Sequence, residues 1–213
     1  MRETILKLYT FDELSDKAKE KAREWWLRCF DGDVSWADFV INDAARMASI
    51  LGINIRTRPL KLMNGSERQD PYIWWSGFSS QGDGACLEGH YAYAKGSCKE
   101  IRKAAPSDTE LHRITDDLMK LQRKFSYKIR CGIVDTGSYD HSNSVHIEDQ
   151  TSDISDFVLD QPSFNEVCEL LRDFMNWIYY GLQKEYEYQT SYAHVDESIR
   201  LNEYEFTAEG HIA

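Results

Sequence analysis

The sequence predicts an α+β fold, with an antiparallel sheet of about four to six strands and helices packed on it. Apolar residues recur at helical spacing near both ends of the chain, whereas several central segments alternate apolar and polar residues. The expected strands follow one another with few helices between them, which favours antiparallel pairing over a βαβ arrangement. No linker rich in proline or serine divides the 213 residues, so we expect a single domain over 1–213.

The first helical region is expected over 10–52. Thr10 and Glu13 have the spacing of a capping box, and Ser15 is a second candidate for the first N-cap. Gly52 is well placed to end the second helix in a left-handed C-cap.

Two tryptophans, Trp25 and Trp26, are adjacent in the first predicted helix. Neighbouring positions on a helix point in different directions, so both cannot face one core. We expect one of them to lie at an interface or between two layers.

The sheet is expected to begin over 53–93. The segment 53–58 alternates, 72–78 is rich in aromatic residues, and 87–93 resembles a third strand. Turn residues separate the three segments, which indicates hairpins.

Two helices are expected over 97–124, and Ser107 with Glu110 forms a second capping box there. Apolar residues then alternate from 125 to 133, which predicts the first strand of a hairpin over 125–148.

The acidic C-terminal part, 163–201, is expected to be helical and to contain the longest helix. Ser163 and Glu166 form a third capping box, and Ser191 is placed to cap a last short helix. The tail at 203–207 is a candidate edge strand.

Charge is distributed unevenly along the chain. The net charge is −11, and residues 148–213 contain fifteen acidic and three basic residues. Residues 95–130 have the opposite bias, with ten basic and five acidic residues. An acidic chain is a poor non-specific ligand of nucleic acid, so direct nucleic-acid binding is not expected. The basic segment can instead meet the acidic C-terminal helix of the same chain.

The glycine-rich loop within 76–90 decides whether catalysis is expected. Its centre reads Gln81-Gly82-Asp83-Gly84, and no lysine follows as a phosphate-binding P-loop requires. The dinucleotide and calcium-loop patterns are also absent. Glycine and aspartate favour tight turns, so we expect a hairpin loop between the strands at 72–78 and 87–93.

Enzymatic readings depend on side chains near this loop. Cys86 and His90 are four residues apart, too far on a strand for a thiolate–imidazole pair. A metal-dependent site through His90, His141 or His146, with Asp83 nearby, is the alternative function. Neither spacing is specific, so we predict no catalytic residues, no metal ligands and no cofactor.

The favoured reading is that carboxylates in the C-terminal part bind a partner. The candidate residues are Glu166, Glu169, Asp173, Glu185, Glu187, Asp196 and Glu197. Complementary charge would speed association with a basic surface.

Three segments carry a resemblance to a known family. They begin at Trp75 (WSGFSSQGDGAC), Ser107 (SDTELHRI) and Val195 (VDESIRLNEYEFT). These segments resemble small proteins carried by phages and prophages, which are often labelled antitoxins of toxin–antitoxin stability systems. The resemblance implies an inhibitor that binds and blocks another protein, and it supplies no catalytic residues.

The expected function is therefore that of a cytoplasmic, phage-type acidic binding protein. It would inhibit a basic host defence protein or a toxin, in an anti-CRISPR-like or antitoxin-like manner, by occupying a surface that can also hold nucleic acid. No apolar run reaches the ~20 residues of a membrane helix. The five cysteines are scattered, as is typical of free thiols in a reducing compartment, and a homodimer is compatible with the sequence.

Overall fold

The computed structural model describes residues 7–31, 33–63, 65–137, 139–153 and 158–213. Helices and antiparallel strands together form the predicted α+β fold. The chain is organised as two compact units, a terminal unit built from residues up to Asp38 with Gln183–Ala213, and a central unit, Phe39–Leu182. Whether the two units fold together as the expected single domain stays a prediction.

The terminal unit brings both ends of the chain together. Its helices are α1 (Asp16–Phe30), the 3-10 helix η1 (Phe11–Glu13) and α6 (Tyr192–Leu201). Strands β1 (Tyr9–Thr10) and β10 (Glu205–Phe206) pair antiparallel, with Tyr9 opposite Phe206. Helices α2 (Ala37–Leu51) and α5 (Gln161–Gln189) begin in one unit and end in the other.

A small hydrophobic core holds the terminal unit together. Its buried members come from η1 and its C-cap, α1, α6 and β10, namely Phe11, Leu14, Ala18, Ala22, Val195, Ile199 and Phe206. Trp25 packs edge-on against Tyr204 and Phe206, with ring centroids 5.0 and 5.9 Å apart. Trp26 packs against the same core and also stacks on Phe30, so the expectation that only one of the two adjacent tryptophans faces the core is wrong.

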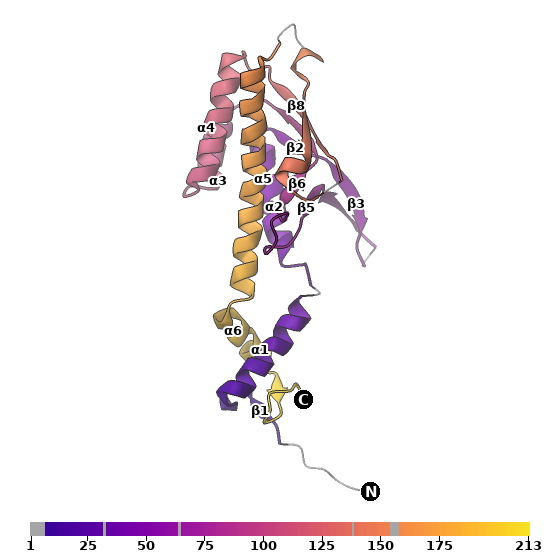
Figure 1. Cartoon of the computed structure of the whole chain (residues 1–213), viewed down its shortest axis with the longest axis vertical. Coiled ribbons are helices and arrows are strands. Elements are labelled where there is room, and N and C mark those ends of the chain that lie inside the picture. The colour runs from indigo at the N-terminus through magenta and orange to yellow at the C-terminus, as the bar shows by residue number, and fades with distance from the viewer. Residues whose placement is uncertain (1–6, 32, 64, 138, 154–157) are drawn as a thin grey trace. The chain divides into compact units, whose positions relative to one another are not determined.

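The central unit is built around a four-stranded antiparallel sheet in the order β2-β7-β8-β9. Its strands are β2 (Ile53–Ile55), β7 (Gly89–Ala92), β8 (Arg130–Asp135) and β9 (Val145–Asp149). Figure 1 shows α3 (Ser97–Ala104), α4 (Thr109–Lys124) and α5 gathered on one side of the strands. The sheet is therefore covered by helices on one face.

Side chains on the four strands alternate as a half-covered sheet requires. The buried positions are apolar, namely Ile53, Ile55, Tyr91, Cys131, Ile133, Val145 and Ile147. The intervening exposed positions are Asn54, His90, Arg130, Val134, His146 and Glu148. We call this second side the open face of the sheet.

Two further hairpins lie between β2 and β7 in the chain. Strands β3 (Thr57–Lys61) and β4 (Glu67–Pro71) pair with each other, and so do β5 (Ile73–Trp75) and β6 (Ala85–Leu87). Three backbone hydrogen bonds close a ring where these strands exchange partners: Arg56 N–H to the Glu88 carbonyl, Tyr72 N–H to Arg56, and Glu88 N–H to Tyr72. We call this ring the three-strand junction.

Helix starts were predicted with mixed success. Ser15 and Ser191 cap α1 and α6, each accepting a hydrogen bond from a backbone N–H three residues on. Ser107 does not cap α4, because the Asp108 carboxylate accepts the Leu111 N–H at 2.8 Å instead. Helix α5 begins before Ser163, whose N–H is bonded by Asp160.

The expected strand at 125–133 begins only at Arg130. Phe125 is the C-cap of α4, and the next two residues, Ser126 and Tyr127, have φ values of 54° and 62°. This left-handed turn is incompatible with an extended strand. Gln122 stabilises it, since its side chain bonds both the N–H and the carbonyl of Ile129.

Candidate functional site

The glycine-rich loop is a hairpin turn, as the sequence predicts, but the second strand of the hairpin is β6. Most of the expected strand 87–93 is instead β7, which pairs with β2 and β8. Trp75 pairs with Ala85 at the base of the loop. Inside the loop, one oxygen of Asp83 accepts the N–H groups of Ser79 and Ser80 at 2.8 and 2.7 Å. Asp83 therefore holds the loop in shape, and its carboxylate is committed to the backbone.

The glycines of this loop permit close approaches. A Cβ on Gly77 would lie 3.2 Å from the Asp83 carboxylate, and one on Gly84 would lie 2.7 Å from the His141 ring. Gln81 and Gly82 are exposed at the tip, and a Cβ on Gly82 would meet nothing within 4 Å. Close packing thus accounts for glycine at the two ends of the loop.

A hollow of about 490 Å³ lies beside the loop. Its lining residues come from the loop and from the segment before η2 (Ser142–Ser144), namely Ser76, Ser80, Gly82, Asp83, Gly137, Tyr139 and Asp140. They include two carboxylates, Asp83 and Asp140, and no histidine or cysteine. Two carboxylates can act as acid and base in hydrolysis, but Asp83 is already bound by two backbone N–H groups.

The three histidines of the metal-site alternative lie in separate surroundings. His90 is exposed on β7, and His146 is exposed on β9 beside Glu148, at 3.5 Å. His141 packs against the loop, where its Nδ1 accepts the Asn143 N–H at 3.0 Å. Across the ranges that the structure describes, no group of three or more His, Cys, Asp or Glu residues is arranged to hold a metal ion.

The buried cysteines are poor nucleophiles. Burial raises the pKa of the Cys86 thiol to about 12, and nearby Asp135 and Asp140 add to the effect. Burial also raises the pKa of Cys131. Thiolates are the reactive form, so both thiols remain protonated and unreactive at neutral pH. His90 offers Cys86 no help, because Cys86 is buried in β6 whereas His90 is exposed on β7.

The structure divides the seven candidate acidic residues into two groups. Asp173 pairs with Arg113 of α4, Glu169 with Arg172 one turn along α5, and Asp196 with Arg23 of α1. The remaining four form no ion pair with any described residue, namely Glu166, Glu185, Glu187 and Glu197. The basic segment at 95–130 therefore meets the acidic helix of its own chain, the alternative that the sequence left open.

Most of the net negative charge of the chain belongs to the terminal unit. This unit has nine basic and sixteen acidic residues, a net charge of −7. The central unit has sixteen basic and twenty acidic residues, a net charge of −4, although it is the longer of the two. The charge per residue is thus several times higher in the terminal unit.

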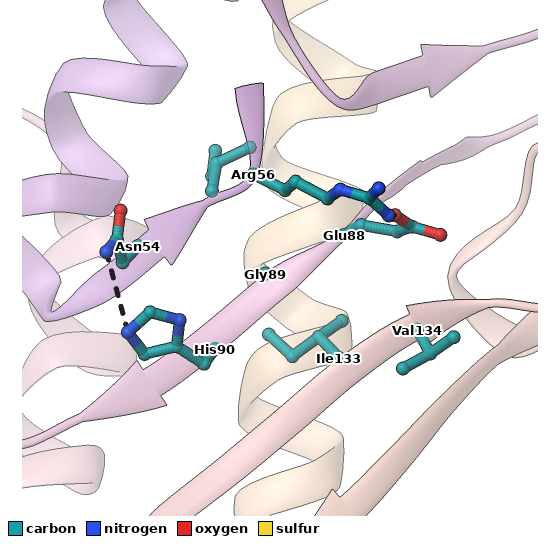
Figure 2. Close-up of a pocket in the computed structure, with 8 residues that line it drawn as sticks. Asn54, Arg56, Glu88, Gly89, His90, Ile133 and Val134 are labelled. Atoms are coloured by element: carbon teal, nitrogen blue, oxygen red, sulfur yellow. Dashed lines mark hydrogen bonds and ion pairs between the residues drawn. The ribbon is translucent and has the colours of Figure 1, made fainter. Parts of the chain in front are cut away.

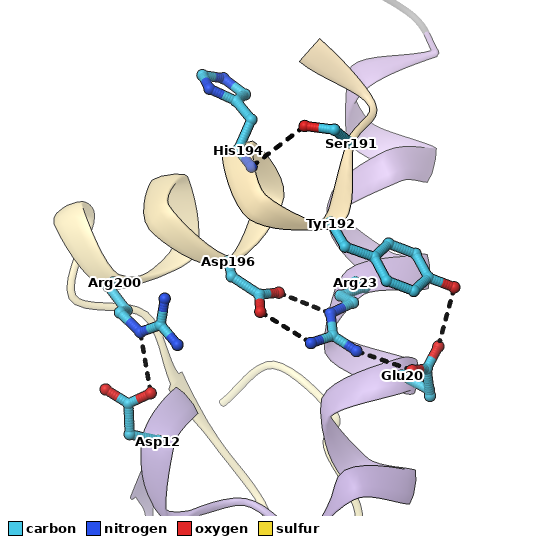
Figure 3. Close-up of polar contacts among 8 residues, drawn as sticks. All are labelled: Asp12, Glu20, Arg23, Ser191, Tyr192, His194, Asp196 and Arg200. Atoms are coloured by element: carbon cyan, nitrogen blue, oxygen red, sulfur yellow. Dashed lines mark hydrogen bonds and ion pairs between the residues drawn. The ribbon is translucent and has the colours of Figure 1, made fainter. Parts of the chain in front are cut away.

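An ion-pair network joins the two helices of the terminal unit, as Figure 3 shows. Arg23 of α1 donates two hydrogen bonds to Asp196 of α6, at 2.6 and 2.8 Å, and both side chains are largely buried. The same guanidinium contacts Glu20 at 2.7 Å and lies over the Tyr192 ring. The hydrogen bond to Asp196 is the main cause of the raised pKa of Arg23. Asp196 is therefore part of the framework of the unit.

A depression of about 430 Å³ on the open face is a feature that the sequence did not reveal. Figure 2 shows Asn54 and His90 side by side at one end, with their side-chain nitrogens 3.5 Å apart, and Arg56 with Glu88 at the other. Arg56 bonds Glu88 at 3.0 Å and lies 4.8 Å from the Tyr72 ring centre. The three-strand junction brings these residues together from segments that are well separated in the sequence.

The lining of the depression is more apolar than polar, and its polar groups are already engaged. Its one strong cation, Arg56, is already paired with Glu88, and His90 faces an amide. The arrangement can accept hydrogen-bonding groups, but its lining residues include no serine, threonine or cysteine that could act as a nucleophile.

One family model matches the chain, over residues 36–192, and its description is a domain of unknown function, DUF8835. That match covers about three quarters of the chain. The chain belongs to this family. No curated protein and no solved structure matches it significantly.

The family domain contains the whole central unit. Helix α1 lies outside it, and so does α6 apart from its first residue, Tyr192. The family description names no activity, so the resemblance to phage-carried proteins stays a prediction. No helix in the described part of the chain combines the length and apolar character needed to cross a bilayer.

Proposed function

We propose that this protein is a non-enzymatic binding protein whose terminal unit docks onto a basic surface of another protein. The finer form of the proposal is an inhibitor of a host defence protein or a toxin, and it rests on the resemblance to phage-carried proteins. The observation that supports docking most directly is the net charge of −7 on the terminal unit, the shorter of the two units.

Unpaired carboxylates strengthen the case for this unit. Glu187 and Glu197 are exposed and form no ion pair with any described residue. Glu24 and Glu203 of the same unit are also exposed. Exposed charges of one sign raise the rate of encounter with an oppositely charged partner and select against partners of the same sign.

The central unit contributes less to such a field. Asp173 and Asp160 face Arg113 and Lys124. These pairs offset one of the five carboxylates of α5 and the carboxylate of Asp160 just before it. The docking residues are therefore Glu185, Glu187 and Glu197 rather than Asp173.

The metal-dependent enzyme has no observation that favours it over binding. Asp83 is engaged by two backbone N–H groups, and His90, His141 and His146 have three different sets of neighbours. Direct nucleic-acid binding through 95–130 is also disfavoured, because Arg102 and Arg113 are each paired with carboxylates.

The test uses immobilised full-length protein as bait in a lysate of the host cell, at low and high salt. Retention of a basic protein that high salt weakens is expected. A Glu187→Gln/Glu197→Gln variant should bind the retained protein about two- to tenfold more weakly, as loss of exposed ion pairs predicts. Glu166→Gln is the matched control, since Glu166 is exposed and unpaired among the described residues but belongs to the central unit. Equal effects of the two changes, or binding indifferent to salt, would refute the proposal.

A further inference from the structure

A continuous row of aromatic rings runs through the terminal unit. Its members come from α1, α5, α6 and the connection between α1 and α2, namely Trp26, Phe30, Trp36, Tyr186, Tyr188 and His194. We call these six residues the aromatic ladder.

Each ring of the aromatic ladder touches the next. Trp26 stacks on Phe30 with centroids 5.3 Å apart and an interplanar angle of 12°. Phe30 continues to Trp36 at 6.2 Å and to Tyr186 at 6.1 Å. At the other end, His194 lies 6.3 Å from Trp26 and 4.7 Å from Tyr188. These separations are those of favourable ring pairs.

The aromatic ladder lies outside the buried core of the unit. Five of its rings are half-buried, and Tyr188 is 55% exposed. Of the six, Trp26 packs against the core from outside, as does its sequence neighbour Trp25, which contacts the core residue Phe206. Partly exposed Trp and Tyr rings held in a fixed arrangement have the composition of binding hot spots.

The segments that carry the aromatic ladder are strongly acidic. Residues 24–36 and 184–197 contain seven acidic and two basic residues. Glu24, Asp31, Asp33, Glu187 and Glu197 among them are exposed. The ladder also contains one buried polar atom without a hydrogen-bond partner among the described residues, Nδ1 of His194.

This surface therefore combines aromatic faces with carboxylates, and its ligand must match both.

A guanidinium group meets both requirements. It is planar, stacks on aromatic faces, and forms two parallel hydrogen bonds to a carboxylate. The terminal unit contains one such arrangement internally, since Arg23 lies 4.7 Å from the Tyr192 ring centre while it bonds Asp196. A lysine ammonium shares the charge but lacks the planar fork, so arginine is the better match.

We propose that the aromatic ladder is the docking site for an arginine-rich segment of a partner protein. This inference rests on the proposed function and adds the site and the chemistry of the partner. The aromatic faces supply the affinity, and the surrounding carboxylates supply orientation and speed of association.

The test measures binding of full-length protein to three synthetic amphipathic peptides that differ only in one residue type: arginine, lysine or uncharged citrulline. Tyr188→Ala removes the most exposed ring of the aromatic ladder. The matched control is Tyr180→Ala, because Tyr180 is 63% exposed on the same helix but belongs to the central unit. Thermal melting of each variant checks that the fold is retained.

The arginine peptide is expected to bind more tightly than the lysine peptide, and the citrulline peptide to bind weakest. Tyr188→Ala should weaken arginine-peptide binding about three- to thirtyfold, the range of one cation–π contact, whereas Tyr180→Ala should leave it unchanged. If Tyr188→Ala lowers the melting temperature strongly, arginine-peptide binding is measured with Tyr188→Leu instead, because leucine keeps an apolar side chain and removes the aromatic face.

Two outcomes overturn the inference in distinguishable ways. If Glu187→Gln/Glu197→Gln weakens binding but loss of the Tyr188 ring does not, or if the arginine and lysine peptides bind equally, the aromatic ladder is not the site and charge-driven docking stands. If neither set of variants changes binding, both the inference and the proposed function fail.

Discussion

The pair between Arg23 and Asp196 allows a quantitative test of whether Asp196 is structural. Removing one partner of a buried ion pair costs ~3–5 kcal/mol. Here the two side chains are 15% and 17% exposed, and Arg23 would keep its contact with Glu20 at 2.7 Å. We therefore expect a cost at or just below the lower end of that scale, about 2–3 kcal/mol, when Asp196→Asn removes the negative charge.

The loss should be local to the terminal unit. Helices α1 and α6 are joined by this pair, so their backbone N–H groups should exchange with solvent faster in the variant. A cost of about 2–3 kcal/mol corresponds to about a 30- to 150-fold rise in exchange through local opening. Hydrogen exchange read by mass spectrometry on peptides from 16–30 and 192–201 measures it directly.

The next residue supplies the control. Glu197 is an exposed carboxylate on the same helix with no ion pair to a described residue, so Glu197→Gln should leave exchange within about twofold of the unmodified protein. The reasoning is wrong if the two variants behave alike, or if Asp196→Asn leaves α1 and α6 as protected as before. Under the proposed function, Glu197→Gln should weaken partner binding directly, although it has the smaller effect on hydrogen exchange.

Three further predictions concern the central unit and the free thiols. Iodoacetamide at about pH 8 should alkylate Cys29, which is exposed, well before Cys86, whose thiol pKa is raised to about 12 by burial; equal labelling by mass spectrometry would contradict this. Gly89→Ala should lower the midpoint of urea unfolding by the equivalent of about 2–3 kcal/mol, because its Cβ would lie 2.2 Å from a backbone oxygen of β2; an unchanged midpoint would refute the close approach. The hydrogen bond from Arg102 lowers the pKa of Asp116, so the stability that this pair contributes is present above the usual pKa of an aspartate and is lost as the pH falls through the lowered one. Asp116→Asn should accordingly flatten the fall in stability below about pH 4 in pH-dependent unfolding curves, and an unchanged slope would argue against the pair.

Local chemistry made much of the fold predictable. Gly52, with a φ of 92°, ends α2 as expected, since a left-handed C-cap favours glycine. The glycine-rich loop forms the predicted hairpin turn because glycine and aspartate suit tight turns. The errors arose where two residues competed for one role. Asp108 displaces Ser107 as the cap of α4, and Asp caps as well as Ser does.

Long-range contacts were beyond prediction from the sequence. The turn at Ser126 and Tyr127 depends on Gln122 reaching Ile129, which no periodicity in 125–133 reveals. The depression on the open face depends on the three-strand junction, where Arg56 meets Glu88. Each requires knowledge of which strands pair, and alternation alone does not specify pairing.

The same limit applies to the charge of the surface. A count along the sequence treats Asp173 and Glu187 as equal members of one acidic helix. In the folded chain Asp173 meets Arg113 of α4, whereas Glu187 hydrogen-bonds only the uncharged Gln183 among the described residues and remains exposed. The potential that a partner encounters is set by the charges left unpaired after folding. By that measure the acidic surface is a property of the terminal unit, where segments from both ends of the chain contribute to one field. A partner that recognises this surface contacts charges from both ends of the chain, so Glu24→Gln, which removes an exposed carboxylate of α1, should weaken binding even though every residue of the acidic C-terminal part is kept.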